Sequence, residues 1–294
     1  MNKFKIVTDS CIDLPVEMIK SLDLTVSPLS VLIDGKVYRN FPDEREITAK
    51  HFYQLLREQK VPTTSQLSPA EHMESMAPLL AEGYDILSIS FSSALSGTYQ
   101  SSIVAINELK EQYPNRIIIA IDSMCASMGQ GLLLTYASRL RKEGKSLEEV
   151  AKWVEDNKRR ISHLFTVGDL NHLKRGGRLS AGKAFIGTLI QLKPLLHVDN
   201  FGKLVPTGSA RGRHHSLTKL VDRLVETIEN PEEQLIYISH GDCIDDANVV
   251  KDLIMKKVNV KGVITHYVGP VIGSHSGLGT LAIFYLGKDR QEAS

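Results

Sequence analysis

The sequence has few cysteines, few aromatic side chains and no dominant charge. Of its 294 residues, 6% are aromatic and only three are cysteines. These cysteines, Cys11, Cys125 and Cys243, lie far apart and form no Cys-x-x-Cys pair. Their spacing excludes a disulfide framework and a zinc site built from cysteine pairs, and it predicts reduced thiols in a cytoplasmic protein.

The sequence also has no apolar run of the roughly eighteen residues that a membrane span needs. Residues 1–4 lead directly into a predicted strand, without a charged and then apolar leader. The formal net charge is +1, and acidic and basic residues are interspersed, so no basic surface for nucleic acid is expected. We expect a soluble, cytoplasmic protein that must enclose any lipid it handles.

Short apolar runs alternate with helical patterns in the first half of the chain. This alternation is typical of α/β proteins, and it predicts a mostly parallel sheet with ligands at the carboxyl ends of its strands. Asp34-Gly35 predicts a hairpin turn, and Ser146 to Glu149 has the spacing of a helix capping box. The predicted strands are Phe4–Val7, Leu24–Ile33, Val37–Tyr38, Asp85–Ser90 and Arg116–Ile121. The predicted helices are Pro15–Leu22, Thr48–Glu58, a helix from Pro69 with Ser68 as its cap, Gly97–Tyr113, Gly131–Arg141 and one that ends near Arg160.

The pattern changes after residue 160, where strands become more frequent. A chain of 294 residues is long for one domain and typical of two domains. Its hydrophobic fraction of 42% is enough to fill two cores. We therefore predict domains at 1–160 and 161–294. The strands expected in the second are His163–Val167, Leu195–Val198, Leu204–Val205, Leu235–Ser239, Val263–Tyr267 and Leu281–Leu286. The helices expected there are Lys183–Ile190, Arg213–Ile228 and Asp245–Lys256.

The segment Phe91–Thr98 (FSSALSGT) is the most informative part of the sequence. It follows an apolar strand and begins a helix, where unpaired backbone N–H groups and the helix dipole favour an anion. Ser96 is the expected N-cap, Gly97 allows a ligand to approach the backbone, and the Thr98 hydroxyl is a further donor. Hydroxyl groups without nearby cations suit a single carboxylate better than a polyphosphate.

Five short motifs follow one another along the chain: Ile6–Ser10 (IVTDS), Thr64–Gln66 (TSQ), Phe91–Thr98 (FSSALSGT), Leu173–Arg178 (LKRGGR) and Gly269–Gly279 (GPVIGSHSGLG). In this order and spacing they resemble those of the DegV family, bacterial fatty-acid-binding proteins that include the B subunit of fatty acid kinase. The resemblance covers about residues 4 to 285. One departure is Leu67, which stands where the family often has proline.

The resemblance implies a function that neither composition nor periodicity reveals. It implies a two-domain DegV-like fold, with a mostly parallel N-terminal sheet flanked by helices and a C-terminal α/β domain with a mixed sheet. A long-chain fatty acid would lie in a buried tunnel between or beneath the domains. Its carboxylate would be presented to a separate ATP-dependent kinase subunit of dihydroxyacetone-kinase type, and the acyl phosphate would feed phospholipid synthesis. The carrier itself would have no stand-alone activity, no cofactor and only transient contact with a membrane surface.

The resemblance also assigns roles to hydroxyl residues at two helix starts. Thr64 and Ser65 precede the helix expected at Pro69, where serine and threonine usually cap or turn the chain. The resemblance instead matches Thr64 and Ser96 to the family's carboxylate-binding pair. It thereby predicts a carboxylate site that contains Thr64, Ser65, Ser96, Gly97, Thr98 and His275.

Two charged residues are predicted near this carboxylate. Arg178 follows Gly176-Gly177, where the backbone can bend sharply; it is either a surface arginine or a group that neutralises charge as acyl phosphate forms. Asp9, at the end of the first strand, either caps a turn or orients a positively charged partner such as Arg178. The resemblance places His275 beside the carboxylate, with Ser276 as a supporting residue.

Arg211 and Arg213 lie in the predicted glycine-containing loop Ser209–Arg213 (SARGR). They are either solvated charges at the entry of a helix or part of a surface that docks the kinase. We interpret them as docking residues.

Other kinds of site fit the sequence less well. Gly177–Ala184 resembles a phosphate-binding P-loop, but Ala184 replaces the hydroxyl that holds magnesium. A serine-type lipid ester hydrolase that uses Ser96 and His275, with Asp9 as the third member, is the alternative enzyme. The Gly-x-Ser-x-Gly elbow of such hydrolases is missing. His240–Cys243 lacks a second ligand cluster and predicts a turn after a strand, so no metal site is expected.

Overall fold

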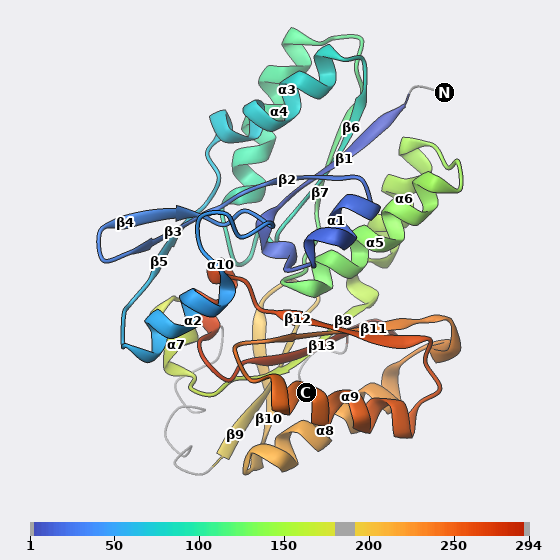
Figure 1. The fold of residues 1–294 in the computed structure, drawn as a ribbon. Coiled ribbons are helices and arrows are strands. Elements are labelled where there is room, and N and C mark those ends of the chain that lie inside the picture. Colours follow the sequence, from blue (N-terminus) through green and yellow to red (C-terminus); the bar gives the residue numbers. More distant parts are fainter. Residues whose placement is uncertain (1–2, 180–191, 291–294) are drawn as a thin grey trace.

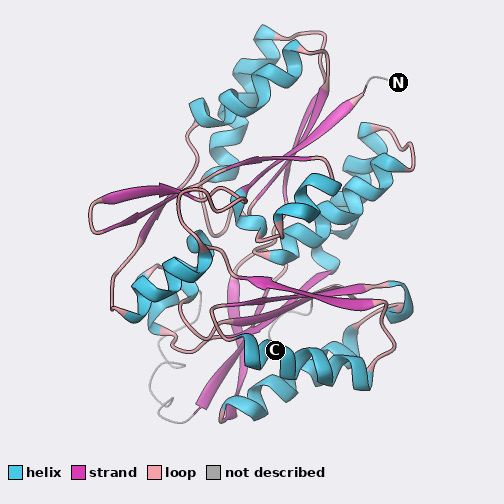
Figure 2. Ribbon diagram, in the orientation of Figure 1, coloured by secondary structure: helices cyan, strands magenta, loops and turns pink. Residues whose placement is uncertain are grey.

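The computed structural model describes residues 3–179 and 192–290. Within these ranges the strands form three sheets, A, B and C, and helices cover their faces (Figure 1, Figure 2). All strands of sheets A and B precede residue 123, and all strands of sheet C follow residue 160. The chain has an α/β fold, as the alternation of elements predicts. The division into two domains at residue 160 stays a prediction.

Sheet A is a parallel sheet with the strand order β2-β1-β6-β7. β2, which follows β1 in the chain, lies on one side of β1, whereas β7, which follows β6, lies in the opposite direction from β6. The direction in which strands are added to the sheet therefore reverses between β1 and β6. In open α/β sheets, ligands bind outside the carboxyl ends of the strands at this position. The strands are Phe4–Asp9 (β1), Leu24–Ser27 (β2), Asp85–Ser90 (β6) and Ile118–Asp122 (β7). The helices of this half are Val16–Ser21 (α1), Ala49–Arg57 (α2), Pro69–Ala81 (α3), Thr98–Gln112 (α4), Met128–Lys142 (α5) and Leu147–Asn157 (α6).

Sheet B is small and antiparallel, and it extends to one side of the molecule (Figure 1). Its strands are Ser30–Ile33 (β3), Lys36–Arg39 (β4) and Thr63–Ser65 (β5). Asp34 and Gly35 both have positive φ, 50° and 79°, as a tight hairpin turn requires, so the predicted hairpin is confirmed. β5 pairs with β3 and thereby fixes the position of Thr64.

Sheet C is a mixed sheet with the order β10-β9-β8-β13-β11-β12, in which only β11 and β12 are parallel to each other. Its strands are Ile161–Thr166 (β8), Leu192–Val198 (β9), Leu204–Arg211 (β10), Leu235–His240 (β11), Gly262–Tyr267 (β12) and Leu281–Leu286 (β13). The helices of this half are Asn171–Arg175 (α7), Arg213–Thr227 (α8), Ile244–Lys257 (α9) and Pro270–Ser276 (α10).

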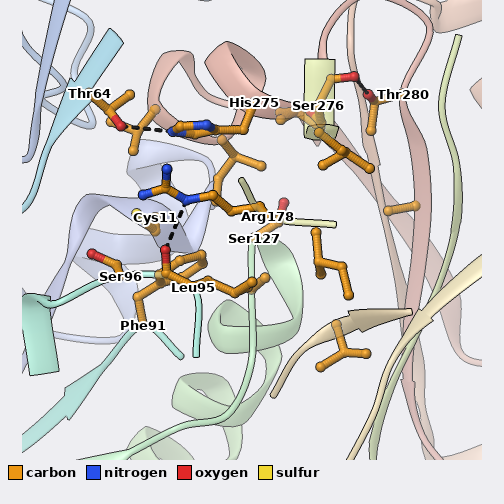
Figure 3. A pocket seen from close by; sticks show the side chains of 18 of the residues that line it. Cys11, Thr64, Phe91, Leu95, Ser96, Ser127, Arg178, His275, Ser276 and Thr280 are labelled. Atoms are coloured by element: carbon orange, nitrogen blue, oxygen red, sulfur yellow. Dashed lines mark hydrogen bonds between the residues drawn. The ribbon is translucent and has the colours of Figure 1, made fainter. Parts of the chain in front are cut away.

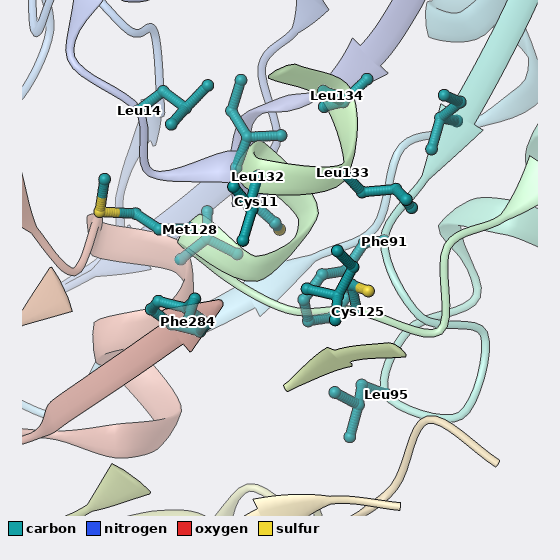
Figure 4. Close-up of a cluster of buried hydrophobic side chains, with 14 of the residues drawn as sticks. Cys11, Leu14, Phe91, Leu95, Cys125, Met128, Leu132, Leu133, Leu134 and Phe284 are labelled. Carbon is teal, nitrogen blue, oxygen red and sulfur yellow. The ribbon is translucent and has the colours of Figure 1, made fainter. Parts of the chain in front are cut away.

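The largest hydrophobic core joins both halves of the chain. It contains Phe91 after β6, Met128 and Leu132 of α5 and Phe284 of β13, so α5 packs between sheets A and C (Figure 4). Smaller cores lie between sheet C and helices α8 and α9, and between sheet A and helices α3 and α4. Because one face of sheet C packs against α5, the two halves share a continuous apolar interior.

Several predicted elements are confirmed and several need correction. Ser68 and Ser146 each form a complete capping box at the start of α3 and α6. The predicted strand Leu24–Ile33 is wrong, because Pro28 separates β2 of sheet A from β3 of sheet B. Thr64 lies in a strand rather than a turn, and Ser209 to Arg211 belong to β10 rather than a loop. The predicted helix Lys183–Ile190 lies outside the described residues.

Candidate functional site

A cavity of about 380 Å³ lies between the carboxyl ends of β1 and β6 and the inner face of sheet C. Its volume falls within the range of about 300–1,000 Å³ that is common for small-molecule sites. Most of its wall is apolar, and residues from both halves of the chain contribute to it (Figure 3). Representative apolar wall residues are Leu29, Phe91, Leu95, Phe165, Val271 and Phe284.

One part of the cavity wall gathers hydroxyl, imidazole and guanidinium side chains from four segments. Thr64 and Ser65 come from β5, Ser96 from the turn before α4, Arg178 from the turn after α7, and His275 from α10. We call these five residues, together with Gly97, the polar end of the cavity. Ser65 is exposed to solvent, so the polar end reaches the surface.

His275 links α10 to β5 at the polar end of the cavity. Its Nε2 atom shares a hydrogen bond of 2.8 Å with the Thr64 hydroxyl (Figure 3). Burial lowers the pKa of His275 to about 4, and the positive charge of Arg178 is a smaller cause of the same shift. The imidazole is therefore neutral at pH 7 in the empty cavity. A Cβ atom at Gly176 would overlap its Nδ1 atom, so a larger residue there would force His275 to move.

Arg178 is aimed by two backbone carbonyl groups. Its Nε donates to the carbonyl oxygen of Leu95 at 3.1 Å and its Nη1 to that of Gly176 at 2.5 Å. These bonds connect the turn after α7 with the turn after β6. A guanidinium held in this way can act as a fixed donor to a carboxylate or phosphate.

The turn before α4 differs in detail from the prediction. Gly97, not Ser96, is the N-cap of α4, although the Ser96 oxygen accepts a hydrogen bond from the Thr98 backbone N–H at 3.3 Å. The Thr98 side chain is fully buried, bonds to the Ser96 hydroxyl at 2.9 Å and does not line the cavity. Ser96 and Gly97 therefore face the cavity, whereas Thr98 supports Ser96 from behind.

Gln66 also lines the cavity, although it was not among the predicted site residues. Its Nε2 donates to the Ser101 hydroxyl at 3.0 Å, and its amide packs so closely on Gly97 that a Cβ there would overlap it. The TSQ motif in which Gln66 stands was the signal that could have identified it.

Asp9 caps a turn, which is the first of its two predicted roles. Its buried carboxylate accepts hydrogen bonds from the backbone N–H of Cys11 at 3.1 Å and of Phe91 at 2.7 Å. Burial raises the pKa of Asp9 despite these bonds. Asp9 thus holds together the turns that follow β1 and β6 and does not line the cavity.

Arg211 and Arg213 lie at the end of β10 and the start of α8, and neither lines the cavity. Arg211 is exposed. Arg213 is not a purely solvated charge, because its Nε bonds to Asp246 of α9 at 2.8 Å with both side chains largely covered. That ion pair connects helices α8 and α9.

The alternative sites are not assembled among the described residues. His275 bonds to Thr64, Ser96 bonds to Thr98, and Asp9 bonds to backbone groups and Gln130, so these residues form no hydrolase relay. His240 ends β11, and Asp242 has a positive φ of 56°, which confirms a turn after a strand. In residues 3–179 and 192–290, no group of three or more His, Cys, Asp or Glu side chains could hold a metal ion. Residues 180–184 of the P-loop-like segment lie outside the described residues.

No helix in the described part of the chain is both long and apolar enough to cross a bilayer.

Comparisons with known proteins identify one family. Residues 3–288 match the profile of the DegV family, which is described as uncharacterised. A DegV domain-containing protein of Clostridium perfringens is 46% identical over 291 residues, which cover 99% of this chain and 100% of the relative. In structure, the chain is similar to a fatty-acid-binding DegV family protein from Thermus thermophilus, with a TM-score of 0.86, 33% identity and coverage of 97% of this chain and 99% of that one. It is also similar to DegV, a fatty-acid-binding protein from Bacillus subtilis, with a TM-score of 0.83, 32% identity and coverage of 98% and 100%.

Proposed function

The chain belongs to the DegV family, and from this premise we propose that it binds one long-chain fatty acid in the cavity, with the carboxylate at the polar end. The observation that carries the proposal is the combination of an apolar cavity with a single cluster formed by Thr64, Ser96, Arg178 and His275. Fatty acid binding by the similar proteins of Thermus thermophilus and Bacillus subtilis supports it.

The energetics favour an enclosed acyl chain. Each buried methylene group contributes about 0.8 kcal/mol, so a chain of about fifteen methylenes dominates the affinity. The hydrogen bonds of the polar end then determine orientation, because a charged carboxylate prefers donors to the apolar wall. In our proposal Thr64, Ser65, Ser96, Gly97 and His275 contact the carboxylate directly. Thr98 and Asp9 support that arrangement through their side chains, and Ser276 supports it through its position next to His275 in α10.

We further propose that the protein is a carrier without activity of its own and works in the cytoplasm. It would present the carboxylate to a separate ATP-dependent kinase subunit of dihydroxyacetone-kinase type, whose acyl phosphate product enters phospholipid synthesis. Arg178 suits this step, because a fixed guanidinium helps most where negative charge increases. Contact with a membrane would be transient and limited to the surface.

The surface around Arg211 is our proposed kinase docking site. Reversing the charge of Arg213 would break its ion pair with Asp246, which connects α8 and α9. Arg211 is exposed at the end of β10, so Arg211→Glu is the variant to test. It should weaken kinase association in a salt-sensitive manner and leave lipid content unchanged. Unchanged association at low salt would remove this surface from the docking site.

The direct test of the proposed function is extraction of the purified protein under denaturing conditions, followed by mass spectrometry. About one long-chain fatty acid per chain is expected, or uptake of one from solution if the protein is purified empty. Addition of ATP and the kinase subunit should then yield acyl phosphate. A protein that neither contains nor takes up fatty acid, or that hydrolyses lipid esters unaided, would contradict the proposal.

A further inference from the structure

The cavity has hydroxyl groups in its wall that do not belong to the polar end. Ser127 at the start of α5, Ser239 of β11 and Ser276 of α10 all line it. We call these three residues the serine wall. In Figure 3, Ser276 lies on the far side of His275 from Thr64, next to Thr280. An unsubstituted acyl chain offers these hydroxyl groups no hydrogen-bond partner, so their presence calls for an explanation.

The side chains of Ser239, Ser127 and Asp13 are connected by hydrogen bonds in that order. The Ser127 hydroxyl donates to the Asp13 carboxylate at 2.5 Å and lies 3.1 Å from the Ser239 hydroxyl. When Ser127 donates its one proton to Asp13, the Ser239 hydroxyl must be the donor in the contact with Ser127. The Ser239 oxygen then retains acceptor capacity, and it makes no other hydrogen bond among the described residues.

The backbone holds Ser127 in this position at a cost. Ser127 has a φ of 52° and a ψ of −143°, values that are unfavourable for a residue with a side chain. The neighbouring Asp13 also has positive φ, 49°, and is 7% exposed. Ser127 thus keeps an unfavourable conformation at a point beside the cavity where a carboxylate and two hydroxyl groups meet.

Ser276 is the clearest unpaired group. Its residue is 5% exposed, and its hydroxyl oxygen has no hydrogen-bond partner within residues 3–179 and 192–290. The neighbouring Thr280 hydroxyl, by contrast, bonds to the Ser276 and Gly277 carbonyl groups. A buried hydroxyl without a partner is destabilising. A ligand that hydrogen-bonds to it removes this cost and therefore binds more tightly.

We propose that the cavity accepts fatty acids that carry a hydroxyl group on the acyl chain, and that this group hydrogen-bonds to the serine wall. The inference rests on the proposed function, because the carboxylate must occupy the polar end for the chain to reach these serines. A ligand hydroxyl can donate to the Ser239 oxygen or accept from the Ser276 hydroxyl, depending on its position along the acyl chain. In an entirely apolar cavity the same hydroxyl would lose its bonds to water and gain none.

The test compares the affinity of stearic acid with that of a positional series of monohydroxystearic acids. Stearic acid binding tests the proposed function, and the ratio of the two affinities tests this inference. At least one hydroxy isomer should bind about as tightly as stearic acid or more tightly. Ser239→Ala, Ser276→Ala or both should lower the hydroxy-to-stearic affinity ratio for that isomer by about tenfold. The ratio is measured within one preparation, so a general loss of folded protein cancels.

Ser138→Ala is the matched control. Ser138 is equally buried in α5, but its hydroxyl bonds to the Leu22 carbonyl and does not line the cavity, so its loss should leave the ratio unchanged. If stearic acid binds but every hydroxy isomer is at least about tenfold weaker, the inference is wrong. The same holds if the two serine variants keep the wild-type ratio, which would indicate that water satisfies the serine wall. If no acid of either kind binds, the proposed function fails together with the inference.

Discussion

The imidazole of His275 lies 2.8 Å from the hydroxyl of Thr64, a residue 211 positions earlier in the chain. This contact joins α10 to sheet B and brings two of the motifs to one end of an apolar cavity. The side chains of both residues are only partly buried, so a ligand at this end of the cavity can reach them.

Thr64→Val should lower fatty acid affinity. The substitution keeps the branched shape that suits β5 but removes a hydrogen bond to a charged carboxylate, which costs on the order of 1.5–3 kcal/mol. Titration with a fluorescent fatty acid checks this. Thr63→Val is the control, because Thr63 is exposed on the same strand and does not line the cavity. Equal affinities for both variants would remove Thr64 from the carboxylate site.

The protonation of His275 should depend on the ligand. Its pKa in the empty cavity is lowered from 6.5 to about 4, so its contribution to stability is full above pH 6.5 and is lost as the pH falls towards 4. A bound carboxylate favours the charged imidazole and should raise this pKa. Histidine NMR titrations of the empty and loaded protein measure both values, and His275→Gln identifies the resonance. Identical values would place the carboxylate elsewhere.

Arg178→Ala should separate lipid binding from phosphorylation. The acyl chain still supplies most of the affinity, so the variant should keep its fatty acid. Acyl-phosphate formation with the kinase and ATP should fall about a hundredfold, because a fixed donor to the developing charge is lost. Lipid content and turnover are measured in the same preparation. A parallel loss of both would show that Arg178 retains the ligand.

Gly176→Ala should disturb the polar end by moving His275. The added Cβ would overlap the imidazole, and such overpacking usually costs about 1–3 kcal/mol. We expect a lower unfolding temperature and weaker fatty acid binding. Gly262→Ala is the control, because its Cβ would meet only Leu235 Cδ2 at an ordinary 3.4 Å and its φ is not positive. A Gly176→Ala protein with wild-type affinity would show that His275 can shift without consequence.

The buried carboxyl group of Asp13 should cause the free energy of unfolding to decrease as the pH rises from about 4 to above 7. Burial raises its pKa to about 7, although the Ser127 hydroxyl opposes the shift. Because the folded state holds the proton more tightly than the unfolded state, this contribution is full below about pH 4 and is lost as the pH rises through 7. Denaturant unfolding of the wild type and Asp13→Asn between these values checks the sign. The variant should show a flatter profile, and an identical slope would assign the dependence to other groups.

Local signals in the sequence predicted much of the fold. The capping boxes at Ser68 and Ser146 and the Asp34-Gly35 turn depend on neighbouring residues, so they could be identified without the rest of the chain. β5 could not, because three polar residues carry no strand pattern and become a strand only where β3 offers an edge. β10 contains Pro206 and Gly208 at a bulge, which conceals its length in the sequence.

The sequence alone determined the family, the α/β alternation and the residue types that suit a carboxylate, because motifs and periodicity are properties of neighbouring positions. Only the tertiary structure decided which of those residues meet. It turned Thr98 and Asp9 away from the cavity, paired Arg213 with Asp246, and placed Gln66 and the serine wall in the lining. Contacts of this kind depend on how sheets A and C pack around α5, and that packing is set by the whole core rather than by any single segment.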